Sequence, residues 1–176
     1  KLIRKNIAAL MIKKSYVKSS FSQFIRTRNV YKKIQNSEQK INYNEYITLR
    51  CIDSGSLTNI ILIYHIEIEL LFVLKVFKDE AQQLYYRENS NFLDIYHPFI
   101  PRYLGAAEYN SNKCIIEEYL EGNSLYHVKN EFSNEDKIRI IFRIMVVLEY
   151  IHYNGFIYRD MKPNNFIVDI DKSVYL

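Results

Sequence analysis

The segment formed by residues 158–165 constrains this chain more than any other part of it. It reads Tyr-Arg-Asp-Met-Lys-Pro-Asn-Asn, so that Asp160 is followed by a cation, Lys162, and then by a carboxamide, Asn165. A helical pattern of apolar residues precedes the segment, and the apolar run at residues 166–168 follows it. The chain must therefore fold so that a helix and a strand meet at a short charged loop.

The residue types in this loop suit the transfer of a γ-phosphoryl group. Such a transfer needs an acceptor for the hydroxyl proton, a positive charge beside the phosphate and an oxygen ligand for Mg²⁺. Asp160, Lys162 and Asn165 supply one group of each kind. The alternative is a solvated loop that carries charge without a catalytic role.

Composition predicts a cytoplasmic protein. A chain of 176 residues that is 48% hydrophobic can bury the core of one domain. Its two cysteines, Cys51 and Cys114, lack metal-ligand spacing and indicate neither a metal site nor a disulfide framework, so a reducing compartment is expected. The longest apolar runs near the N-terminus are too short to cross a membrane, and we expect no transmembrane segment.

Charge is distributed unevenly along the chain. Residues 1–40 hold 11 Lys or Arg and one acid, a local charge of +10, whereas the rest of the chain sums to −6. We therefore predict a basic N-terminal extension at 1–44 and a domain at 45–176. The extension could contact anionic lipid, nucleic acid or an acidic protein, or could be solvated without a partner, and we predict no nucleic-acid function from it.

Local patterns predict a mixed set of strands and helices. Segments rich in β-branched and aromatic residues indicate strands, and apolar residues at helical spacing indicate helices. Strands are expected at residues 46–52, 59–65, 70–77, 103–108 and 113–117, and a helix at 80–93.

A long helix is expected before the charged loop. Residues 133–136 resemble a capping box, and Gly155 is placed to end the helix. Its predicted buried stripe consists of Ile138, Ile141, Phe142, Met145, Leu148 and His152.

The order of these elements, with the motif at residues 158–165, resembles a eukaryotic protein-kinase domain between residues 46 and 176. The approach to the loop, at residues 148–157, is similar to the segment that precedes the kinase catalytic loop, and Lys162 is typical of the serine/threonine-specific branch. The resemblance implies an α+β fold. A five-stranded antiparallel small lobe with one helix would occupy 45–119, and the start of a mainly helical large lobe 120–176.

The resemblance assigns roles to the loop residues. Asp160 would be the catalytic base that accepts the hydroxyl proton, and Lys162 would neutralise charge on the transferring phosphate of ATP. Asn165 would hold Mg²⁺. A protein would be the phosphate acceptor.

Two further residues match the part of the family that holds the phosphates. Residues 72–75 look like the strand motif V-A-I-K, which makes Lys75 the residue that contacts the α- and β-phosphates. Its partner on the next helix would be Glu88, counted back from His97-Pro98, with Glu80 as the alternative.

The adenine site would lie beside residues 115–122, which resemble the hinge between the lobes. The backbones of Glu118 and Leu120 would bond the adenine edge, and Glu117 would limit the back of the pocket, where an apolar residue or Thr is more usual. A buried carboxylate at that position needs a partner or must stay protonated. The apolar walls around the ring would be Ile52, Ile60, Val73 and Ile167.

The chain departs from the family pattern in several places. Its glycine-rich loop keeps only Gly55, with Asp53 close to the nucleotide entrance, and Tyr158 replaces the histidine of the catalytic loop. The chain starts at Lys1 and stops at Leu176, before the position of the metal-binding Asp-Phe-Gly, so we expect a fragment with no phosphoryl transfer of its own. A non-catalytic pseudokinase or scaffold, and a small-molecule phosphotransferase, are the alternatives to a serine/threonine kinase.

Overall fold

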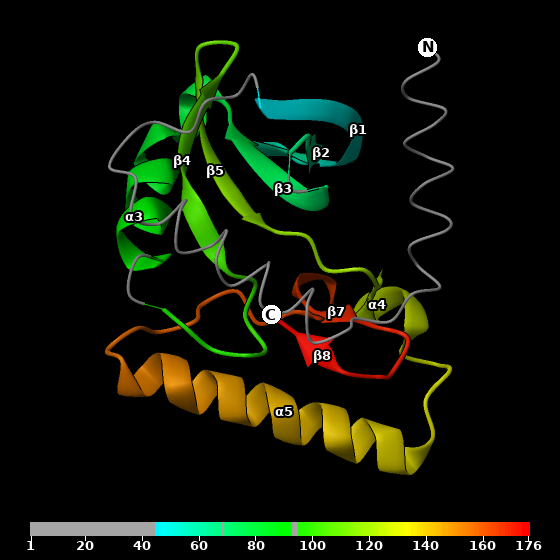
Figure 1. The fold of residues 1–176 in the computed structure, drawn as a ribbon. Coiled ribbons are helices and arrows are strands. Elements are labelled where there is room, and N and C mark those ends of the chain that lie inside the picture. The colour runs from blue at the N-terminus through cyan, green and yellow to red at the C-terminus, as the bar shows by residue number, and fades with distance from the viewer. Residues whose placement is uncertain (1–44, 68, 93–94) are drawn as a thin grey trace.

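The computed structural model describes residues 45–67, 69–92 and 95–176 (Figure 1). The predicted basic extension at residues 1–44 lies outside this part of the chain, so its role stays a prediction. None of the described helices is long and apolar enough to span a bilayer.

Five antiparallel strands form the larger sheet, in the order β1-β2-β3-β5-β4 (Figure 1). All five lie where the sequence predicted strands. A single turn of 3₁₀ helix (Asp79–Ala81) and the helix α3 (Gln82–Phe92) connect β3 to the segment before β4. The strands are β1 (Tyr46–Ser54), β2 (Thr58–His65), β3 (Leu70–Phe77), β4 (Tyr103–Tyr109) and β5 (Asn112–Glu118).

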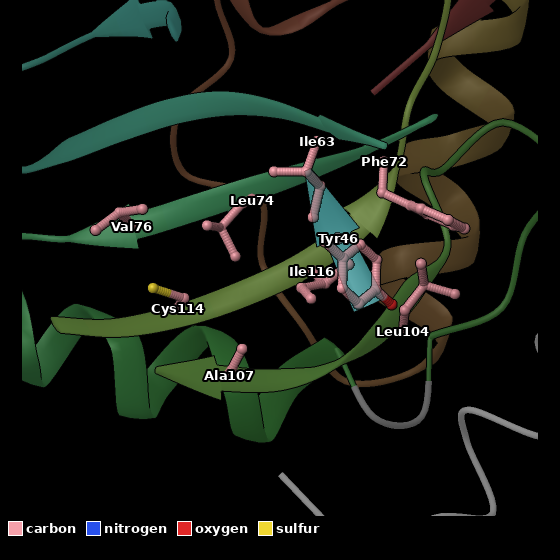
Figure 2. Packing of buried hydrophobic residues seen from close by; sticks show 9 residues of the cluster. All are labelled: Tyr46, Ile63, Phe72, Leu74, Val76, Leu104, Ala107, Cys114 and Ile116. Carbon is pink, nitrogen blue, oxygen red and sulfur yellow. The ribbon is translucent and has the colours of Figure 1, made fainter. Parts of the chain in front are cut away.

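Alternation along β3 gives the sheet two distinct faces. Phe72, Leu74 and Val76 point to one face, where they are buried in an apolar cluster with residues of the neighbouring strands (Figure 2). Because successive side chains of a strand point to opposite faces, Val73, Lys75 and Phe77 belong to the other face. On that face Phe77 packs with Ala81 and Tyr85 of the α3 segment, so Lys75 is directed to the same side of the sheet as α3.

A second, small sheet follows the hinge segment. It consists of β6 (Asn123–Ser124), β7 (Ile167–Val168) and β8 (Val174–Tyr175), paired in that order. A short helix, α4 (Leu125–Val128), follows β6, and neither α4 nor β6 was predicted. A Cβ added to Gly122 would collide with the Val168 carbonyl oxygen, so only glycine allows the hinge to pass this close to β7.

The long helix α5 (Asn134–Tyr153) begins and ends as the sequence predicts. Ser133 and Asp136 form the capping box, and Gly155 follows the helix with a φ of 81°, a left-handed conformation that glycine adopts without strain. The expected α+β fold is thereby confirmed, since a five-stranded antiparallel sheet with one helix precedes α5 and the charged loop (Figure 1).

The predicted buried stripe of α5 is wrong. Ile138, Ile141, Phe142, Met145 and His152 are exposed, and Leu148 is only partly covered. The buried apolar residues of α5 are instead Ile140, Val147 and Ile151. Ile140 belongs to the apolar cluster beneath the charged loop, and the other two belong to the cluster around Ile100. The helix carries two apolar stripes, and spacing alone does not tell which one faces the described core.

The corrected orientation of α5 predicts that two neighbouring isoleucines contribute unequally to the free energy of unfolding. Ile140→Ala should lower the free energy of unfolding by about 2–5 kcal/mol, because Ile140 is 4% exposed and its removal leaves a cavity. Ile141→Ala, at a residue that is 57% exposed, should cost much less. Urea unfolding of both variants makes the comparison. A larger loss for Ile141→Ala would restore the stripe expected from the sequence.

Candidate active site

A cleft of about 690 Å³ lies between the five-stranded sheet and the charged loop. Its lining brings together residues that are far apart in the sequence. Among them are six of the predicted site residues: Ile60, Lys75, Glu88, Asp160, Lys162 and Asn165. A larger cavity of about 810 Å³ lies beside α4 and the β7–β8 turn, and contains none of these six. The chemistry suggested by the sequence therefore points to the first cleft.

Lys75 and Glu88 form a direct ion pair across the sheet–helix boundary. The Lys75 Nζ lies 2.5 Å from the Glu88 Oε2, and both side chains are largely buried. Glu80, the alternative partner, is exposed in the 3₁₀ turn before α3. The ammonium of Lys75 also lies 5.5 Å from the centre of the Phe77 ring, within the range of a cation–π contact.

The charged loop is held by hydrogen bonds from Asn165. Its Nδ2 donates to the Asp160 backbone oxygen and to the Asp160 Oδ2, both at 2.8 Å. Residues Pro163–Asn165 form a 3₁₀ turn, with proline at a position where its missing N–H is no loss. This turn carries Asn165 back toward Asp160 and leaves the Asn165 amide oxygen as the atom suited to coordinate a metal.

Asp160 is exposed, and its surroundings favour its charged form. The Lys162 ammonium lies 2.8 Å from the Asp160 Oδ2. Hydrogen bonds from Lys162 and then from Asn165 hold the pKa of the Asp160 carboxyl below its usual value. Asp160 is therefore an anion at neutral pH, as an acceptor for a hydroxyl proton must be.

Tyr158 has a structural part in the loop that the sequence did not show. Its hydroxyl accepts a hydrogen bond of 3.0 Å from the Asn165 Nδ2, and burial raises its pKa. Tyr158 also packs against the apolar residues under α5. The sequence treated Tyr158 only as a replacement for histidine, because a hydrogen bond to a residue seven positions later is not visible in a pattern.

Other predicted nucleotide-binding residues do not line this cleft. Ile52 is 41% exposed on β1. Gly55 closes the β1–β2 turn, where its N–H donates to the Thr58 oxygen and its carbonyl accepts from the Lys78 Nζ. The remaining ones lie on β3, at the hinge and on β7: Val73, Glu118, Leu120 and Ile167.

Glu117 is a carboxylate inside the cleft, at the end of β5. It lines the cleft together with Lys75 and Glu88. Burial raises the pKa of Glu117, an effect that the positive charge of Lys75 opposes and the negative charge of Glu88 reinforces. Lys75 is therefore the nearby charge that the sequence could not identify.

The raised pKa of Glu117 predicts a pH-dependent loss of stability. Folding favours the neutral form of Glu117. The stability that this protonated carboxyl contributes is therefore fully present below its usual pKa of 4.5, and is lost as the pH rises through the raised pKa of the folded state. Glu117→Gln should therefore gain stability over the wild type as the pH rises. Thermal unfolding across the acidic and neutral range tests this, with exposed Glu121→Gln as the control. A stability difference that is the same at every pH would contradict the expectation.

Comparison with known proteins identifies the family. A model of the protein kinase domain matches residues 46–176. Ribosomal protein S6 kinase 2 alpha of Xenopus laevis is 25% identical over 154 residues, which cover 81% of this chain and 21% of that protein. The serine/threonine-protein kinase RHS3 of Arabidopsis thaliana is 33% identical over 85 residues, which cover 46% of this chain and 17% of that protein. The chain thus spans about a fifth of the length of these relatives, and it belongs to the protein kinase family.

Proposed function

We propose that this chain contributes the nucleotide site and the catalytic loop of a serine/threonine protein kinase, which transfers the γ-phosphoryl group of ATP to a protein hydroxyl. One observation carries the proposal. The Lys75–Glu88 ion pair and the loop formed by Asp160, Lys162 and Asn165 face the same cleft. Phosphoryl transfer depends on positioning and charge stabilisation, and this cleft holds groups for both.

Each group in the cleft has a distinct part in the proposal. Glu88 holds Lys75 in place, and Lys75 contacts the α- and β-phosphates. Asp160 accepts the proton of the substrate hydroxyl, and Lys162, now paired with Asp160, neutralises charge on the phosphate. Asn165 would hold Mg²⁺, and the bound ion would stabilise the negative charge on the phosphate oxygens.

The adenine ring belongs, in this proposal, beside the hinge. The Glu118 backbone N–H already donates to the Arg102 oxygen at 2.9 Å, so its carbonyl is the group available to an adenine amine. The Leu120 backbone would bond the same edge. Gly55 would cover the phosphates, and the apolar walls would be Ile52, Ile60, Val73 and Ile167.

The proposal also includes the boundary between the lobes, the location of the protein and the class of acceptor. The boundary between a small lobe at 45–119 and a large lobe at 120–176 is supported by the change from the five-stranded to the three-stranded sheet near the hinge. A cytoplasmic location is supported by the two free cysteines, one exposed at Cys51 and one buried at Cys114. The acceptor is a protein with a serine or threonine, since Lys162 and the names of the relatives both favour that branch.

Replacing Lys75 tests the nucleotide site. In the full-length protein, Lys75→Met should lower phosphoryl transfer by about 100-fold or more, because the mutant lacks the cation that contacts the phosphates. The fold should persist at some cost in stability, since methionine fills a similar volume but leaves Glu88 without its cation. Incorporation of labelled γ-phosphate with Mg²⁺ and circular dichroism give the two measurements. Unchanged transfer would remove Lys75 from the site.

Replacing Asp160 tests the catalytic base. Asp160→Asn should slow transfer by about 10²–10⁴-fold while ATP still binds, because the amide cannot accept the hydroxyl proton. Asp171→Asn, at an exposed position in the β7–β8 turn, is the matched control and should be active. If the wild type binds ATP without any transfer to protein, the site serves a non-catalytic role and the proposed reaction is wrong.

A further inference from the structure

The strand register places Glu117 close to Lys75 on one face of the sheet. Glu117 pairs with Val73 of β3, and Lys75 pairs with Ile115 of β5. Residues that face each other across two strands share a face, and so do residues two apart on one strand. Glu117 and Lys75 are therefore diagonal neighbours on the α3 side of the sheet, a spacing that long side chains can bridge.

Lys75 consequently lies between two acids from different elements. Glu88 reaches it from α3 as an ion pair, and Glu117 lies diagonally beside it on β5. Tyr103 of β4 also lies on this face, where it pairs directly with Glu117, and burial raises its pKa to about 12. Tyr103 is thus neutral, and its hydroxyl donates to the Asn89 Oδ1. Lys75 is the cation of this group.

The charges that line the cleft are balanced when Glu117 is ionised. The four basic residues are Lys75, Arg87, Arg159 and Lys162, and the four acidic residues are Asp53, Glu88, Glu117 and Asp160. The neutral form of Glu117 leaves the cleft with one net positive charge. ATP is a polyanion, so this difference changes the electrostatic free energy of its binding.

We propose that Glu117 is a second carboxylate partner of Lys75, which shares the lysine with Glu88 and thereby limits the affinity of the cleft for the nucleotide phosphates. The proposal rests on the proposed function, since it concerns the same nucleotide site. Glu117 acts through Lys75 and is a positioning residue. An apolar side chain at this place would narrow the pocket but would leave the whole charge of Lys75 to the phosphates.

The proposal gives ATP binding a defined pH dependence. Because burial raises the pKa of Glu117, its charge develops above the usual carboxyl range. As the pH rises, the growing negative charge should weaken the binding of ATP to the wild type relative to a variant without that carboxylate. Adenosine carries no phosphate, so its binding should not depend on Glu117 in this way.

Nucleotide titrations of the full-length protein test the proposal. Glu117→Gln, which keeps the size of the side chain, should bind ATP about tenfold more tightly than the wild type where the Glu117 carboxylate is ionised, and this difference should shrink as the pH is lowered. Adenosine affinity should be unchanged, and Glu131→Gln, at an exposed position outside the cleft and the hinge, should behave as the wild type. Equal gains for ATP and adenosine would indicate a change of pocket shape and would overturn the proposal, as would an unchanged ATP affinity.

A second measurement needs no nucleotide. Carboxylate partners hold the Lys75 amine in ion pairs and restrict its contact with an acylating reagent. The rate of acylation at Lys75 is measured by mass spectrometry in the wild type and in the Glu88→Gln variant, each with and without Glu117→Gln. Glu117→Gln should raise this rate more in the Glu88→Gln variant than in the wild type. No effect of Glu117→Gln in the Glu88→Gln background would show that the lysine is not shared. If no variant binds ATP but this coupling is present, the proposed function fails while the shared lysine stands.

Discussion

The ion pair between Lys75 and Glu88 is the contact through which the sheet, the helix α3 and the cleft depend on one another. Lys75 is fixed by the register of β3 against β2 and β5, and Glu88 by the packing of α3 against the Phe77 face of the sheet. A largely buried charge pair stabilises a fold only when its geometry is good, and the loss of either partner leaves an uncompensated charge. The position of α3 and the charge available at the cleft are therefore linked in a single contact.

In the charged loop, too, a few contacts connect the reactive groups to the packing of the fold. Asn165 joins the hydroxyl of Tyr158 to the carboxylate of Asp160, and Lys162 contacts the same Asp160 oxygen. These contacts hold Asp160 in position and favour its ionised form. Because the side chain is not deeply buried, desolvation does not raise its pKa above the usual value. Tyr158 also contacts the apolar core beneath α5, so the orientation of Asn165 depends on the packing of that helix.

Much of this arrangement could be predicted from sequence, because it depends on local patterns. The alternation in β3 and the turn residues beside it specify the strands, and the capping box at Ser133 specifies the start of α5. The choice of Glu88 over Glu80 followed from spacing to the proline turn, and the structure places Glu88 beside Lys75. What spacing could not settle was which apolar stripe of α5 faces the described core, since Ile140 and Ile141 are equally apolar.

Short elements and long-range neighbours were also beyond the sequence. The two-residue strand β6 and the single turn of α4 have too few residues for a period to appear, and they form because Gly122 lets the hinge approach β7. The neighbour of Glu117 required the register of β3 against β5, which no local pattern encodes. A carboxylate in an otherwise apolar stretch of sequence is a conflict between local preference and burial, and such conflicts concentrate at functional sites. In this chain the buried carboxylate of Glu117 lies beside Lys75, on which the proposed chemistry depends. We therefore expect it to affect the charge of the cleft as well as the stability of the fold.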